Sequence, residues 1–150
     1  MASLIGYYSL IFGFCFSLII VFFSIKNFKN SIIFDKKLIF LTFLQFFFVV
    51  LSFFGLIFSF VNSDFSNETV FNHSHTTIPL FYKVSGTWGN HEGSLLLWLL
   101  VLTLFIFIFL LKIKKQIKNY RILTLIFQEI IIIGFFIFLL KTSNPFNYIF

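Results

Sequence analysis

Four long stretches without charge limit what this chain can fold into. They cover residues 4–25, 38–61, 94–111 and 122–140, and Glu129 is the one charged residue inside them. At about 1.5 Å per residue, helices of these lengths span about 27–36 Å, close to the ~30 Å hydrocarbon core of a bilayer. A backbone in lipid must satisfy its own hydrogen bonds, and no stretch alternates in polarity as a barrel strand does. We therefore predict an all-α integral membrane protein, with four transmembrane helices in a single domain of residues 1–150.

Composition supports this fold class. Hydrophobic residues make up 59% of the chain and charged residues 11%, whereas a typical soluble domain is about 25% charged. The mean hydropathy is +1.02. Too few polar residues are present to cover the surface of a soluble fold of this size, so a bilayer is the expected solvent.

The charges between the apolar stretches predict the orientation. The connections 26–37 and 112–121 are basic, whereas the long loop 62–93 carries more acids than lysines. The positive-inside rule places the two basic connections in the cytoplasm or matrix, and the long loop, both termini and Lys141 on the trans side. The basic residues are Lys26, Lys29, Lys36 and Lys37, then Lys112, Lys114, Lys115, Lys118 and Arg121. This topology accounts for the net charge of +6 with membrane lipid as the partner, and we expect no nucleic-acid binding.

The first half of the long loop reads as an exposed polar segment. Residues 62–77 are rich in Asn, Ser, Thr and His, as solvated loops are. Asn67 and Asn72 each begin an N-glycosylation sequon, but this composition produces such matches by chance, and we do not predict glycosylation. His73 and His75 lack a third ligand, so we predict no metal site there.

The second half of the loop is apolar and then rich in glycine. Residues 78–84 form a short aromatic segment that is expected to lie along the interface or over the helix ends. Gly86, Gly89 and Gly93 allow tight turns and close backbone approach. Trp88 and Trp98 have amphipathic rings that favour the headgroup region.

The start of the third apolar stretch carries groups with two interpretations. Ser94 is expected to cap this helix, and Glu92 complements its positive end, so a structural role suffices for both. His91 lies at the membrane edge, where an imidazole is structural or else binds haem iron or carries a proton.

The run 88–98, WGNHEGSLLLW, resembles the WGxHEGSLLLW signature of the CcmF/NrfE haem-lyase family. Three further segments resemble the same family at matching spacing: IPLFYKV at 78–84, NSDF at 62–65 and TSNPF at 142–146. The resemblance covers essentially the whole chain, and the eleven-residue run is highly specific.

The resemblance implies a role in cytochrome c maturation. In that family a haem chaperone, CcmE, delivers haem to the trans face, and the lyase joins the haem vinyl groups to the thiols of a CxxCH motif in apocytochrome c. Residues expected at the edge of the haem site are Trp88, Gly89, His91, Glu92, Gly93 and Trp98. No catalytic residue and no metal ligand is assigned to this chain.

The family's tryptophan-rich WWD segment, which holds haem, is absent from these 150 residues. We therefore expect an N-terminal fragment of a split haem lyase, with haem held mainly by a partner chain that bears the WWD segment. The alternative is a structural or assembly subunit of a respiratory-chain complex. A transporter is disfavoured, because too few polar residues are seen to line a path.

Two further expectations concern the membrane. Glu129 is costly in lipid and is expected to meet a Lys or Gln of the missing fragment, or else to stay protonated. The 28 phenylalanines and the heavy use of Ile, Lys and Asn suggest an AT-rich genome. This favours the mitochondrial inner membrane, with the long loop in the intermembrane space; the alternative is a bacterial inner membrane, with the loop in the periplasm.

Overall fold

The computed structural model describes residues 2–29, 35–112 and 118–149. Within them the chain forms four long helices and two short ones. The long helices are α1 (Ala2–Lys29), α2 (Asp35–Val61), α5 (His91–Lys112) and α6 (Lys118–Lys141), and the short ones are α3 (Glu68–His73) and α4 (Leu80–Gly86). All four long helices are long and apolar enough to cross a membrane. The predicted fold class and number of spans are confirmed.

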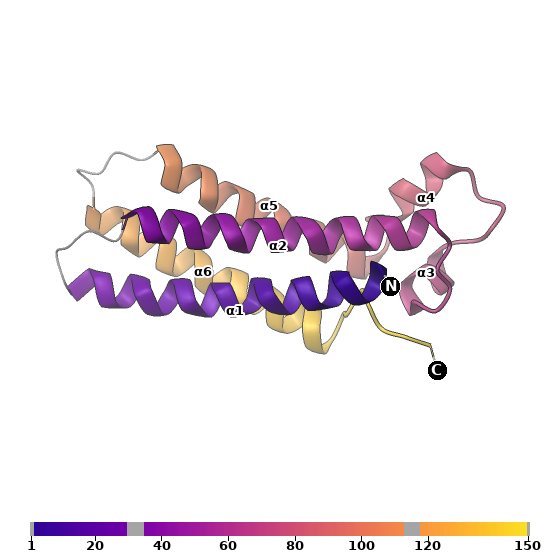
Figure 1. The fold of residues 1–150 in the computed structure, drawn as a ribbon, viewed down its shortest axis with the longest axis horizontal. Coiled ribbons are helices and arrows are strands. Elements are labelled where there is room, and N and C mark those ends of the chain that lie inside the picture. The colour runs from indigo at the N-terminus through magenta and orange to yellow at the C-terminus, as the bar shows by residue number, and fades with distance from the viewer. Residues whose placement is uncertain (1, 30–34, 113–117, 150) are drawn as a thin grey trace.

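The four long helices form a bundle in which each packs against two neighbours. The packed pairs are α1 with α2, α2 with α5, α5 with α6 and α6 with α1, and α4 lies against α2. Figure 1 shows α3, α4 and both chain ends at one end of the bundle. The end of α1, the start of α2, the end of α5 and the start of α6 lie at the other end. The long loop and the basic residues Lys26, Lys36, Lys37 and Lys112 therefore lie at opposite ends of the helices.

Each long helix buries one seam with alternating spacings of three and four residues. The buried positions are Ser3, Gly6, Leu10, Gly13, Ser17, Ile20 and Ser24 in α1; Leu38, Thr42, Gln45, Val49, Ser52, Leu56 and Ser59 in α2; Leu96, Leu99, Thr103, Ile106 and Leu110 in α5; Ile122, Leu125, Glu129, Ile132, Phe136 and Leu139 in α6. This seven-residue repeat is the packing pattern of left-handed helix bundles. Small and polar side chains fill much of it, so α1 and α2 carry rows of buried polar residues that hydropathy alone does not reveal.

Two glycines let α1 and α2 approach closely. A Cβ atom on Gly55 would lie 3.0 Å from Cα of Gly6 and 3.2 Å from the carbonyl oxygen of Ala2. Small residues at such crossings are typical of membrane helices, because dispersion contacts between backbones replace the hydrophobic effect there. In the sequence, Gly6 and Gly55 are isolated glycines on different helices, so their contact could not be predicted from spacing.

The long loop is more ordered than a solvated connection. It contains α3 and α4, and α5 begins at His91, three residues before the predicted start. In α4, Leu80, Phe81 and Tyr82 are exposed, while Gly86 lies against the ring of Phe60. Helix α4, which includes residues 80–84, thus packs against the end of α2, as one of the two expectations had it, and presents aromatic rings outward.

Glu129 has its partners within this chain. Its Oε2 accepts hydrogen bonds from Ser17 Oγ at 2.6 Å and from Gln45 Nε2 at 2.9 Å, and its side chain is fully buried. The expectation of a Gln partner was right in residue type and wrong in location, because the glutamine belongs to α2 and not to another fragment.

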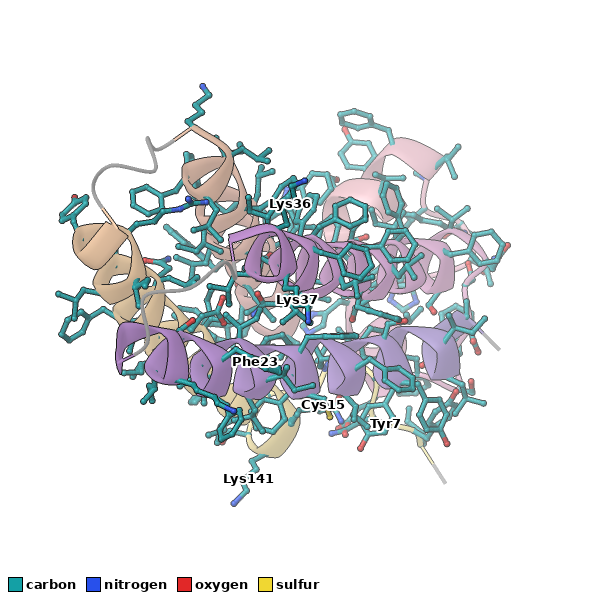
Figure 2. All side chains as sticks on the ribbon, turned by 60° about the vertical axis from the view of Figure 1, so that its left-hand side comes forward. Tyr7, Cys15, Phe23, Lys36, Lys37 and Lys141 are labelled. Atoms are coloured by element: carbon teal, nitrogen blue, oxygen red, sulfur yellow. The ribbon has the colours of Figure 1, made fainter. Side chains whose placement is uncertain are left out.

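The charged ends fit the predicted topology, whose sidedness remains a prediction. Figure 2 shows Lys36 and Lys37 at the start of α2, and Lys141 extending away from the bundle. Lys114 and Lys115 lie outside the described residues.

A matched pair of glycine substitutions tests the α1–α2 crossing. Gly55→Val should lower the free energy of unfolding by about 1–3 kcal/mol, because its side chain meets backbone atoms that cannot move aside. Gly134→Val is the control, since nothing lies within 4 Å of a Cβ atom there. Thermal unfolding in detergent measures both; equal effects would contradict the close crossing.

Labelling tests the orientation. Asn72 is exposed on α3, so Asn72→Cys in a Cys15→Ser background should react with a membrane-impermeant maleimide added from the trans side. Labelling of this cysteine from the cytoplasmic or matrix side would contradict the predicted topology.

Candidate functional site at the start of helix α5

Asn90 joins α4 to α5. Its Oδ1 accepts the backbone N–H of Gly93 at 2.6 Å, which is the bond of a helix N-cap, and its Nδ2 donates to the carbonyl oxygen of Gly86 at 2.9 Å. Ser94 was predicted as the cap, and this prediction is wrong. Ser94 lies in the first turn, where its Oγ donates back to the carbonyl oxygen of His91 at 2.9 Å.

Gly93 leaves no room for a side chain. A Cβ atom there would lie 1.6 Å from the carbonyl oxygen of Thr87. Thr87 is fully buried, and its backbone is held between α4 and the side chain of Asn90. Gly93 therefore determines how closely the turn packs on α5. This agrees with the prediction that the glycines of this loop allow close backbone approach.

His91 meets the segment that follows α6. Its Nδ1 lies 3.1 Å from Oγ of Ser143, and its ring makes an edge contact with Phe138 at 6.2 Å between centroids. The structure therefore brings together two of the sequence segments that carry the resemblance, although 52 positions separate them. In the described part of the chain, no group bonds the other ring nitrogen, Nε2, and the side chain is exposed.

Asn67 fixes the segment that carries Ser143. Its Nδ2 donates to the carbonyl oxygen of Pro145 at 2.9 Å and to Ser3 Oγ at 3.1 Å, and its Oδ1 caps α3. A side chain that is fully buried and bonded in this way cannot carry a glycan, so the sequon at Asn67 has a structural explanation. The sequence indicated Asn67 only as the first residue of a sequon, and its hydrogen bonds to Ser3 and Pro145 could not be predicted from the sequence.

The other predicted site residues are spread over one surface. Trp88 and Gly89 are exposed in the α4–α5 turn, and Trp98 is 60% exposed on α5. His91 and Trp98 are seven residues apart and so share a face of α5. Glu92 is half-buried, and its Oε2 has no hydrogen-bond partner among the described residues. Trp88, Gly89, His91 and Trp98 thus form an exposed strip along α5 and its preceding turn, whereas Gly93 is buried.

An apolar groove lies beside this strip, between α5 and α6. It has a volume of about 340 Å³ and is lined by Leu95, Ile131, Gly134, Phe135 and Phe138. Phe138 connects the two features, because it lines the groove and contacts the ring of His91. An imidazole therefore stands at the polar end of an apolar surface.

The chemistry of the strip is that of a binding edge. The described residues hold no group of three or more His, Cys, Asp or Glu that could bind a metal ion. A single exposed imidazole, oriented through Nδ1, can offer Nε2 to an iron atom or a proton donor. Further groups would have to come from outside these residues.

Curated relatives match about two thirds of this chain. The cytochrome c-type biogenesis protein ccl1 of Rhodobacter capsulatus is 40% identical over 102 residues, or 68% of this chain and 16% of its own length. CycK of Rhizobium meliloti is 42% identical over 101 residues, covering 67% of this chain and 15% of its own. NrfE of Haemophilus influenzae is 38% identical over 100 residues, again 67% and 16%. This chain is a homologue of the N-terminal part of the CcmF, CycK and NrfE proteins.

The fold leads to the same relatives. A solved structure named cytochrome c haem lyase CcmF superposes with a TM-score of 0.90 over 98% of this chain and 25% of that one, at 24% identity. This likeness shows the fold of the CcmF N-terminal helices. No family model matches the sequence. The chain spans about one sixth of the length of its curated relatives.

Substitutions of Gly93 and Gly89 test the geometry of the turn between α4 and α5. Gly93→Ala should destabilise the turn by about 1–3 kcal/mol and perturb the His91 environment, because its methyl group collides with a fixed carbonyl. Gly89→Ala should have little effect, since its Cβ would make ordinary contacts of 3.4 Å or more. Thermal unfolding and limited proteolysis of the loop would show the difference; a tolerated Gly93→Ala would contradict the packing described.

Proposed function

We propose that this four-helix unit acts in cytochrome c maturation as the N-terminal part of a haem lyase, where the start of α5 forms one wall of the haem-attachment site. The observation that carries the proposal is the contact between His91 and Ser143, because it unites two of the segments that this chain shares in pattern with the haem-lyase family. The relatives at about 40% identity are named for cytochrome c biogenesis, which supports this role.

Haem enters this proposal as substrate. His91 would offer its exposed Nε2 to the iron in the tautomer in which Nδ1–H donates to Ser143 Oγ, since no group of the described chain bonds Nε2. The groove beneath Phe138 fits the apolar edge of a porphyrin. One imidazole and one apolar edge do not enclose a haem, so the remaining contacts belong to other parts of the lyase.

Those other parts define the proposed partners. The rest of the lyase, including a tryptophan-rich WWD segment, is proposed to pack against this unit as a separate fragment. CcmE is the proposed donor of haem, and apocytochrome c the proposed acceptor. The exposed strip of Trp88, His91 and Trp98 supports the assignment, since aromatic side chains are enriched where proteins and flat ligands bind.

The proposed location is the mitochondrial inner membrane, with the long loop in the intermembrane space. The AT-rich coding suggested by 28 phenylalanines supports it. The matched relatives come from bacteria, and a bacterial inner membrane with a periplasmic loop accommodates the same topology and the same chemistry.

Substitution of His91 tests the proposed role. His91→Ala should leave the chain assembled and lower covalent haem in cytochrome c by about tenfold or more, while Ser143→Ala should cause a smaller loss by releasing the ring. Haem staining of cytochrome c after gel electrophoresis measures both. His73→Ala and His75→Ala are matched controls, because both side chains are exposed on the long loop.

Two results would contradict the proposal. Unchanged covalent haem in His91→Ala would leave the segment with a bracing role alone. Purification of the native chain with an oxidase or a bc-type complex, and without any protein or segment bearing the WWD motif, would favour the structural subunit instead. The mass of the native polypeptide also decides whether the remainder of the lyase is a separate fragment.

A further inference from the structure

Glu129 and Gln45 face one another in the interior of the bundle. Only two of the four polar atoms in their side chains have a hydrogen-bond partner among the described residues. The Gln45 amide donates from Nε2 to Glu129 Oε2 at 2.9 Å, and Ser17 Oγ donates to the same oxygen at 2.6 Å. The other carboxylate oxygen, Glu129 Oε1, and the single oxygen of the Gln45 amide, Oε1, are buried and have no partner among the described residues. Both side chains are fully buried. Two unpaired acceptors therefore remain on two groups that already touch.

An ionised carboxylate leaves this arrangement unsatisfied. It would place a negative charge in a low-dielectric interior with two hydrogen bonds, and would leave the Gln45 carbonyl oxygen without a donor. One proton on Glu129 Oε1 removes the charge and also supplies a donor to pair with that oxygen. The ring of two hydrogen bonds between a carboxylic acid and a primary amide then uses every polar atom of both groups.

The charged groups of the described side chains that could neutralise a carboxylate are remote from this position. α6 packs against α1 and α5, whose described charged residues, Lys26, Glu92 and Lys112, lie at or near helix ends, as does His91. Lys36 and Lys37 lie at the start of α2. The other buried charged side chain in the described part of the chain is Arg121. It lies eight residues from Glu129, about 12 Å along α6, and donates to the carbonyl oxygen of Leu110 at 2.8 Å.

We propose that Glu129 is a proton-binding site inside the membrane, in which the neutral acid donates from Oε1 to Gln45 Oε1 and closes an acid–amide pair. The pair joins α6 to α2, while Ser17 adds α1 to the same site. Because α6 leads directly into Ser143, the site also fixes the helix that brings Ser143 to His91. This inference is independent of the proposed function in haem attachment.

Infrared spectroscopy of the full chain at neutral pH tests the protonation state. The difference spectrum between the native chain and Glu129→Gln should show the C=O stretch of a protonated carboxylic acid. The exchange variant, Gln45→Glu with Glu129→Gln, rebuilds the pair in the opposite direction and should restore this band. If Glu129→Gln instead lost an ionised-carboxylate band that the native chain has, Glu129 would be charged and the proposal would be overturned.

Thermal unfolding of the same chain supplies the second measurement. Glu129→Gln should keep the melting temperature nearly unchanged, because an amide can replace the acid in the ring. Glu129→Leu and Gln45→Leu should each lower it by about 5–10 °C, the first by removing the pair and the second by leaving the acid unpaired. An equal loss in Glu129→Gln and Glu129→Leu would overturn the proposal. A second result would also overturn it: sodium chloride, but not choline chloride, raises the melting temperature of the native chain. That result would mean that Glu129 Oε1 and Gln45 Oε1 bind a sodium ion.

Discussion

Helices in a bilayer gain little by burying apolar side chains against each other, because lipid tails are as apolar as leucine. The packing of this bundle therefore depends on the small and polar residues along its seams. Ser3, Gly6, Gly13, Ser17 and Ser24 repeat along the buried face of α1, and Gly55 lets α2 approach Gly6 closely. Most phenylalanines are exposed or half-buried, whereas leucines and isoleucines fill most of the remaining seam positions. Glu129 lies on the same buried repeat of α6.

The seams also determine how the candidate site is assembled. The buried repeat of α6 continues past the helix end to Ser143, which meets His91 at the start of α5. The segment beyond is fixed by Asn67, and the ring of Phe146 packs on Gly6. One end of the bundle is thus tied by hydrogen bonds that include the start of α1, α3, the segment after α6 and the turn before α5. A surface held from several directions keeps a side chain such as His91 in a fixed orientation, which a binding edge requires.

The sequence predicted the features that depend on length and composition, and missed those that depend on pairing. Four spans followed from bilayer thickness, and a loop with close backbone approach followed from the glycines. The seam was hidden because apolar residues surround each helix, so that burial does not stand out against hydropathy. The cap was assigned to Ser94 because hydropathy placed the helix start at the last charged residue, whereas the helix extends through Glu92 to His91 and Asn90 caps it. Asn67 and Ser143 could be recognised only once residues more than 50 positions apart were brought together.

The pairing of Glu129 with Gln45 was also not predicted from hydropathy, but the buried repeat of the helices accounts for it. A lone carboxylate in an apolar helix predicts a polar partner, and glutamine was one of the two residue types expected. The sequence contains that glutamine on α2, but nothing in hydropathy relates the registers of α2 and α6. The seven-residue repeat does so, because Gln45 and Glu129 both fall on it and so both point into the bundle. In a membrane chain of this composition, a polar residue on the same repeat as serines and glycines is therefore better evidence of helix pairing than the apolar pattern around it.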